Sequence, residues 1–249
     1  MSSYTDAKLH WEFGTAYDFF VSQLVLHHPE RFSLRPNWAA GVRSRLNPEL
    51  RQTLEHAENA LPMPIRFVFN LPGKTKNADA VLKELGSLAP LKRLELISGF
   101  ERINPTCQKI LRETTPGNPW SDVEREMLLE STANADRKSS PRYLESLYAI
   151  WSDPKAFSDM YLAALTAYKD NFFAEEEQRI LPALKQALSY AQMRAGSLSL
   201  PLLLEDLTSG VRYSDLEQTK NIHLAPSFWI SPLMFSVRPE KDRLIILYG

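Results

Sequence analysis

The chain has 249 residues, a hydrophobic fraction of 44% and a formal net charge of −1 at pH 7. The balanced charge excludes a protein that binds nucleic acid over its whole surface, and the single cysteine, Cys107, excludes an intrachain disulfide and a thiolate metal cluster within one subunit. The first residues do not have the pattern of a signal peptide, and no apolar run approaches the roughly 18 residues that span a bilayer, so we expect a cytoplasmic protein without membrane contact.

Prolines mark the starts of several predicted helices. In each case a residue that can cap a helix N-terminus precedes a proline, which suits the first helical position: Asn47-Pro48, Asn104-Pro105, Ser140-Pro141 and Asp153-Pro154. Ser121 and Glu124 have the spacing of a capping box, in which each side chain satisfies a free backbone donor of the other residue.

The apolar residues between these marks recur every three or four positions, which predicts helices with one buried face. The longest such pattern runs from 154 to 194. Pro182 lies inside it, and we expect a kink or break there because proline has no backbone N–H and its ring crowds the preceding turn.

Strand signals are few. Ile65–Phe69 is one predicted strand, and the C-terminal region predicts a hairpin in which alternating apolar residues from Leu233 are followed by a turn at 239–242 and an apolar run at 244–248. Pro226 and Pro232 suit the approach to this hairpin rather than a central strand. The fold class we predict is mainly α, a single multi-helix domain over 1–249 with a long kinked helix and a small C-terminal β-hairpin at about 222–249.

The stretch Phe67–Thr75 comes nearest to a nucleotide-binding motif, because Gly73-Lys74-Thr75 matches the end of a phosphate-binding loop. That loop needs a second glycine five positions before Gly73, where this chain has Val68, and Pro72 removes a backbone amide. We interpret the stretch as a strand, a turn and a solvated loop.

Three charged or polar clusters fit structural roles better than sites. Adjacent histidines on a helix point in different directions, so His27-His28 is more typical of a helix C-terminus than of a metal site. Glu175–Glu177 fits the first turn of a helix. The arginines at 31, 35, 43, 45 and 51 form the most basic stretch, for which phosphate contact stays an alternative, although neighbouring glutamates dilute its charge.

Aromatic residues gather along the long helical region and the helix before it. They fit a core, but tyrosine and tryptophan also line many ligand pockets, so they are the candidate residues of an effector pocket. The set is Tyr148, Trp151, Tyr161, Tyr168, Phe172 and Phe173. The motifs of serine hydrolases, zinc proteases and dinucleotide-binding proteins do not occur, so we predict no catalytic residue, metal ligand or cofactor.

Four stretches together resemble a known family. They are Tyr17-Asp18-Phe19-Phe20 leading to His28-Pro29, "FFAEEEQRILPALKQAL" at 172–188, "LAPSFWISPLMF" at 224–235, and "LIILYG" at 244–249. Most of the chain resembles the amino-terminal helical domain of a group of bacterial ArsR-like transcriptional regulators, in which that domain precedes a winged helix-turn-helix.

The resemblance implies a regulatory domain that forms a homodimer and binds a small-molecule effector between its helices. No winged helix can be assigned within 1–249, so DNA would be bound only through a winged-helix domain outside this sequence. Because Cys107 stands alone, no metal-sensing residues are carried over from the family. Two alternatives stay open: a free-standing helical interaction module without a DNA role, and an enzyme whose site is assembled from distant residues.

Overall fold

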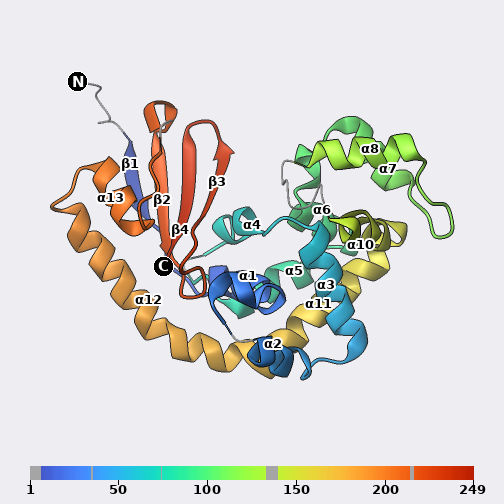
Figure 1. Cartoon of the computed structure of the whole chain (residues 1–249), viewed down its shortest axis with the longest axis horizontal. Coiled ribbons are helices and arrows are strands. Elements are labelled where there is room, and N and C mark those ends of the chain that lie inside the picture. The colour runs from blue at the N-terminus through green and yellow to red at the C-terminus, as the bar shows by residue number, and fades with distance from the viewer. Residues whose placement is uncertain (1–6, 35, 74, 133–139, 214–215) are drawn as a thin grey trace.

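The computed structural model describes residues 7–34, 36–73, 75–132, 140–213 and 216–249. Its fold is mainly helical, as predicted, with a small sheet at one end and α7, α8 and α10 at the other (Figure 1). The helices are α1 (Ala16–His27), α2 (Pro36–Arg43), α3 (Pro48–Ala60), α4 (Ile65–Phe69), α5 (Ala78–Ser87), α6 (Pro90–Ser98), α7 (Pro105–Glu113), α8 (Asp122–Ser131), α10 (Pro141–Ser152), α11 (Pro154–Tyr168), α12 (Ala174–Ala195) and α13 (Leu200–Leu207).

The predicted helix starts are confirmed at the level of single hydrogen bonds. The side chains of Asn47, Asn104 and Asp153 each accept a hydrogen bond from a backbone N–H in the first turn of the helix that follows. Ser140 precedes α10 without such a bond. Ser121 and Glu124 form the predicted capping box at the start of α8.

The sheet has four strands: β1 (Lys8–Trp11), β2 (Asn221–Pro226), β3 (Phe235–Glu240) and β4 (Arg243–Tyr248). Their order is β1-β2-β4-β3, and only β3 runs antiparallel to its neighbour. The hairpin β3–β4 confirms the prediction for the end of the chain. The parallel pairing of β1 and β2 with it was not predicted.

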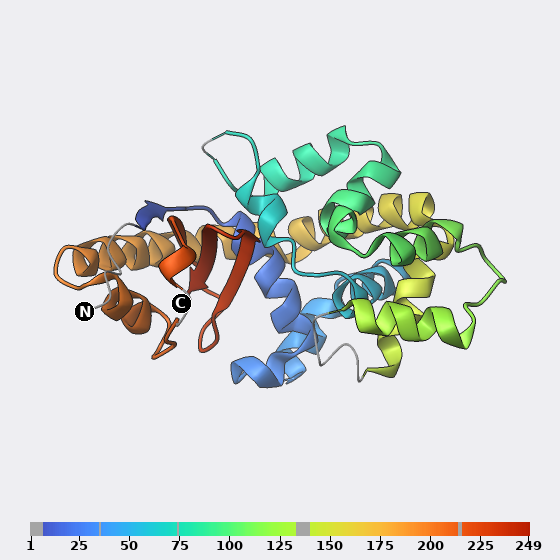
Figure 2. The same ribbon diagram turned by 90° about the horizontal axis from the view of Figure 1, so that it is seen from above.

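After Arg243, β4 consists of buried residues from Leu244 to Tyr248, as is typical of a strand with both faces covered. Leu244, Ile246 and Tyr248 pack against residues of α12 and α13, whereas Ile245 and Leu247 belong to the main core that includes α1. The sheet therefore separates two hydrophobic clusters. Figure 2 shows α12 and α13 lying along one side of it and α1 entering the body of helices on the other.

The body of helices is held together by packing and by one buried arginine. α3 contacts α10 and α11, while α5 and α6 contact the opposite side of α11. Arg93 of α6 is 5% exposed, and its guanidinium donates hydrogen bonds to the carbonyls of Leu85 on α5 and Ser158 on α11. It satisfies backbone acceptors of two neighbouring helices at once, which fixes their relative positions.

The long helical region differs from the prediction in where it departs from α geometry. α12 continues through Pro182, so of the expected kink or break the break does not occur. The departure lies instead at 169–173, where a π-helical segment joins α11 to α12 and turns Phe172 and Phe173 into the core. Glu175, Glu176 and Glu177 occupy the first turn of α12, the place in a helix that the sequence predicted for them.

Two strand predictions were wrong. Ile65–Phe69 forms the short helix α4, in which Ile65 and Val68, three positions apart, lie on one helical face and Phe67 is buried as well. Pro226 lies within β2, which has neighbours on both sides. This is possible because β1 pairs with β2 only as far as Leu224, so the missing N–H of the proline lies beyond the end of β1.

Candidate functional site

Five of the six aromatic residues proposed for an effector pocket, all except Tyr148, belong to the buried core. Trp151, Tyr168 and Phe173 are each at most 1% exposed. Trp151 lies 4.8 Å from Phe100, measured between ring centroids, and the rings of Tyr168 and Phe173 are 6.4 Å apart. The Tyr168 hydroxyl donates to Ser22 Oγ, so its polar atom is also occupied within the core.

Tyr148, Phe172 and Tyr161 lie at different places. Tyr148 is half-buried beside Trp120 and lines a cleft of about 240 Å³ between α8 and α10. Phe172 packs against Trp38 of α2. Tyr161 lines a cavity of about 30 Å³, room for about one water molecule. The six residues therefore do not surround one common cavity.

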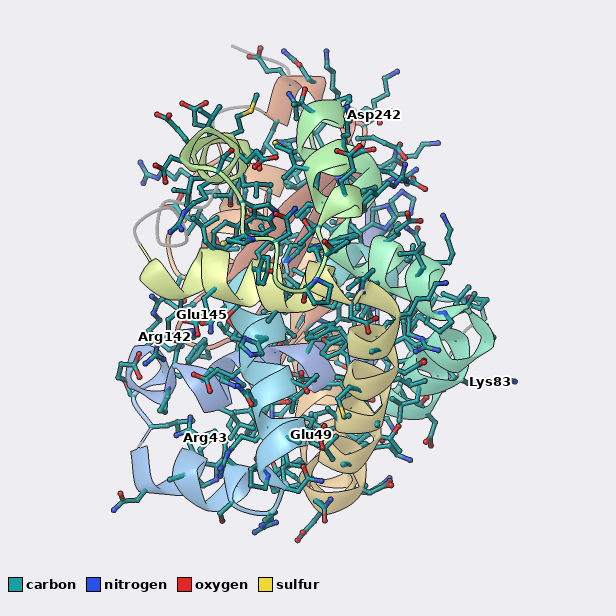
Figure 3. The ribbon with its side chains drawn as sticks, turned by 90° about the vertical axis from the view of Figure 1, so that its right-hand side faces the viewer. Arg43, Glu49, Lys83, Arg142, Glu145 and Asp242 are labelled. Carbon is teal, nitrogen blue, oxygen red and sulfur yellow. The ribbon has the colours of Figure 1, made fainter. Side chains whose placement is uncertain are left out.

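Two larger clefts lie beside each other on the body of helices. The first, here called the basic cleft, has a volume of about 470 Å³ and lies between α1, α2, α3 and α10. Figure 3 faces this side of the molecule, with Arg43 of α2 and Arg142 of α10 on the same flank of α3. The lining residues are His27, His28, Ala40, Arg43, Arg51, Glu55, Asn59 and Arg142.

The basic cleft has a positive balance of charge. Three arginines face one carboxylate, and arginine stays protonated at any ordinary pH. Arg142 pairs with Glu55 at 3.3 Å, but both side chains are largely exposed, so the pair is weak. Arg43 donates to the carbonyl of Leu26 at the end of α1. Arg51 makes no side-chain hydrogen bond within the described part of the chain.

His27 adds no charge to this cleft. Its Nδ1 donates to the carbonyl of Gln23 at 2.8 Å, which places the proton of the neutral ring on Nδ1 and leaves Nε2 as an acceptor. Burial lowers the pKa of His27, because desolvation disfavours the charged imidazolium, although nearby Glu58 acts in the opposite direction. At neutral pH the positive charge of the cleft comes from its arginines.

The second cleft, here called the apolar cleft, has a volume of about 600 Å³. One wall comes from the body of helices, with Leu24, Phe32 and Met63 among its residues, and the other comes from the segment that leads into β3 and from β3 itself. The residues of that second wall are Leu233, Phe235, Ser236 and Val237. An occupant would therefore touch the helices and the terminal hairpin at once.

The clefts adjoin, because His28 and Asn59 line both of them. His28 lies 3.7 Å from Glu58, and Asn59 donates to Ser146 Oγ of α10. Glu58 lines the apolar cleft, where it is the carboxylate closest to this junction. The arrangement resembles a polar compartment joined to an apolar one, as in many sites for small amphipathic molecules.

The wall formed by β3 is tied to α1 by a buried carboxyl group. Asp18 of α1 accepts hydrogen bonds from Ser227 Oγ at 2.8 Å and from the Trp229 N–H at 2.9 Å, in the loop between β2 and β3. Asp18 is 0% exposed. Desolvation raises the pKa of this carboxyl group to about 6, against the opposing effect of its hydrogen bonds.

Other predicted features carry no chemistry in the described residues. No group of three or more histidine, cysteine, aspartate or glutamate side chains is placed to hold a metal ion there. Glu177 accepts hydrogen bonds from Thr15 and from the first N–H of α5, a structural use of the acidic run. Lys74 of the glycine-lysine-threonine stretch lies outside the described residues. Across the described ranges, no helix has both the length and the apolarity to cross a bilayer.

Only part of the lining of the two clefts could be predicted from the sequence. Arg31, Arg43 and Arg51 belong to the basic stretch noted there, and the structure places them at the clefts, whereas Arg45 points to the carbonyl of Asn171. Arg35 lies outside the described residues. Arg142 and the residues of β3 come from distant segments, and no local pattern connects them with the basic stretch.

Comparison with known proteins identifies a family and no individual relative. Residues 22–224 match a family described as a family of unknown function, DUF5937. No curated protein and no solved structure matches the chain.

Proposed function

The chain belongs to the DUF5937 family, and we propose that it is the regulatory domain of a bacterial transcriptional regulator. In this proposal the domain binds a small-molecule effector and forms a homodimer, and DNA is bound through a winged-helix domain outside this sequence. The resemblance of four stretches to ArsR-like regulators supports the proposed role in transcriptional regulation. The two adjoining clefts support effector binding.

One observation carries the proposal. The apolar cleft has one wall on the body of helices and the other on Leu233–Val237, which leads into and forms the terminal hairpin. A ligand in that cleft changes the relation of the hairpin to the helices only if it binds one arrangement better than another. In a dimeric regulator the geometry of the pair sets the spacing of the DNA half-sites, so a change at the hairpin would alter DNA affinity.

The dimer contact belongs at the end of the molecule that holds α12 and α13. Tyr190 and Met193 lie three positions apart on α12 and are 48% and 64% exposed, and Leu202 on the adjacent α13 is 54% exposed. Exposed apolar side chains on two neighbouring helices are typical of a surface that a partner covers. We assign this surface to the second copy of the chain.

The experiment fills the apolar cleft without relying on any particular ligand. Leu233 is 44% exposed and lines the cleft just before β3, so Leu233→Trp places an indole where an effector would lie. The natural polypeptide that contains this chain is tested for binding to the DNA upstream of its own gene, with and without the substitution. We expect two chains per DNA site and a change in DNA affinity of about fivefold or more.

The control is Ser87→Trp, which adds the same indole at an exposed position at the end of α5, a helix that lines neither cleft and is apart from α12 and α13. It should leave DNA affinity unchanged. Absence of DNA binding by the natural polypeptide would contradict the proposed role in transcription, and equal DNA affinity of wild type and Leu233→Trp would contradict the role of the cleft.

A further inference from the structure

We infer that the two adjoining clefts bind an organic anion with an apolar body, its carboxylate in the basic cleft and its apolar part in the apolar cleft. The inference deepens the proposed function, on which it rests for the identification of the clefts as a ligand site. It concerns binding alone, so it can be tested on this chain without DNA.

The choice of an anion follows from the charges that face the basic cleft. Arg43, Arg51 and Arg142 oppose a single lining carboxylate, Glu55, which pairs with Arg142 and with no other cation in the described part of the chain. The planar fork of a guanidinium matches the two oxygens of a carboxylate, and such paired hydrogen bonds are among the strongest in proteins. Arg51 has no side-chain partner among the described residues, so it is available to a ligand.

The neighbouring cleft explains why the anion has an apolar body. Leu24, Phe32 and Met63 line it from the helices, and Leu233 and Val237 line it from the hairpin side. Burial of apolar ligand surface between these walls provides the main favourable free energy of binding. A small inorganic anion would leave this cleft unused.

The two compartments suit one ligand rather than two. His28 and Asn59 line both clefts, so a molecule can pass from one to the other at that point. The cleft volumes of about 470 and 600 Å³ each lie in the range of about 300–1,000 Å³ that is typical of small-molecule sites. In the apolar cleft the carboxylate of Glu58 offsets the charge of Arg31, so this cleft has no excess positive charge to hold a second anionic group. The ligand is therefore expected to be charged at one end only.

The experiment measures binding of decanoate to the whole chain by calorimetry, with decan-1-ol as the uncharged probe of similar length. Decanoate should bind with an affinity about tenfold or more above that of decan-1-ol, because the alcohol cannot form charge-assisted bonds with the arginines. Arg51→Gln should lower the affinity for decanoate about tenfold and leave the affinity for decan-1-ol unchanged. Acetate, which has the same charge and hardly any apolar surface, should bind much more weakly than decanoate.

Two further variants separate the compartments. Arg125→Gln makes the same change on an exposed position of α8, away from the two clefts, and should bind decanoate like wild type. Leu233→Ser alters the apolar cleft at a residue that is 44% exposed, so the fold should tolerate it. It should weaken decanoate and decan-1-ol alike, and thermal unfolding should confirm that each variant is folded.

Three results would overturn the inference. They are absence of saturable decanoate binding up to about 1 mM, equal affinity for decanoate and decan-1-ol, and a folded Arg51→Gln variant that keeps the decanoate affinity of wild type. Decanoate binding that leaves DNA affinity unaltered in the natural polypeptide would contradict the proposed function and leave the assignment of the ligand class intact.

Discussion

At the scale of single residues, Asp18 is the buried ionisable group with the clearest structural role. Its Oδ1 accepts hydrogen bonds from Ser227 and from the Trp229 N–H, and its Oδ2 has no partner in the described structure. A buried carboxylate with one unpaired oxygen is unfavourable, which is why desolvation raises its pKa to about 6. The contact between α1 and the loop before β3 should therefore depend on pH.

The direction of this dependence follows from proton linkage. The pKa of Asp18 rises from an ordinary value of 3.8 to about 6 on folding, so the native state binds more protons than the unfolded state in that range. The contribution of Asp18 to the free energy of unfolding is fully present below pH of about 4 and is lost as pH rises through about 6. For a pKa shift of this size, the total loss is about 3 kcal/mol.

Asp18→Asn removes the titration and keeps an oxygen acceptor for Ser227 and Trp229. We expect the free energy of unfolding of wild type, relative to the variant, to fall by about 3 kcal/mol between pH of about 4 and 7. Urea unfolding across this range measures the difference. Asp122→Asn, at an exposed position of α8, controls for loss of one negative charge. A difference between wild type and Asp18→Asn that stays constant with pH would contradict this prediction.

At the scale of elements, Pro182 raises a question about α12. The helix continues through Pro182, although proline cannot donate to the carbonyl four residues before it and its ring crowds the preceding turn. Pro182 is exposed, so its side chain contributes little to the core. The proline is therefore a cost to helix stability that packing does not offset.

Pro182→Ala should raise the free energy of unfolding by roughly 1–3 kcal/mol, because alanine restores the missing hydrogen bond and removes the clash. The midpoint of thermal unfolding measures this. Pro201→Ala is the matched control: Pro201 lies in the first turn of α13, where the backbone N–H has no helical partner, so the change should be small or slightly unfavourable. A loss of stability in Pro182→Ala would show that the proline supports a required shape of α12.

The elements that the sequence predicts well are those whose signals are local. The side chains of Asn47, Asn104 and Asp153 cap backbone groups that lie within three residues of them. A short sequence pattern is therefore sufficient to predict these helix starts. At 65–69 the same apolar residues fit a strand or a short helix, and the packing of Ile65, Phe67 and Val68 in the core decides between them. The pairing of β1 with β2 joins residues about 213 positions apart, such as Lys8 and Asn221, and no local pattern contains it.

The same reason explains why the candidate site was predicted only in part. Arg43 and Arg51 lie in one basic stretch, but Arg142 and Val237 reach the clefts from segments far away in the sequence. The aromatic set was selected by composition, and Trp151, Tyr168 and Phe173 are used in packing. Aromatic residues suit a core and a pocket equally well, so only their three-dimensional surroundings distinguish the two uses.

At the scale of the whole molecule, the sheet is shared between two hydrophobic clusters. Alternate residues of β4 face the main core and the cluster formed with α12 and α13, so a displacement of the sheet disturbs both. β3 lies at the edge of the sheet, where β4 is its one strand partner in the described residues, and its inner side faces the apolar cleft. Like β1, it has one strand partner among the described residues, and it is the strand that lines the apolar cleft.

Hydrogen exchange can therefore test whether the clefts communicate with the hairpin. A ligand that binds only the folded state slows local opening, and at about 100 times its Kd the gain is about 2.7 kcal/mol. With decanoate at that level, we expect slower exchange in β3 as well as in the segments of α1 and α3 that line the clefts. Exchange in α7, at the far end of the molecule, should hardly change through local opening (Figure 1). Slower exchange in α1 and α3 with β3 unaltered would mean that the ligand is held by the helices alone and does not act on the hairpin.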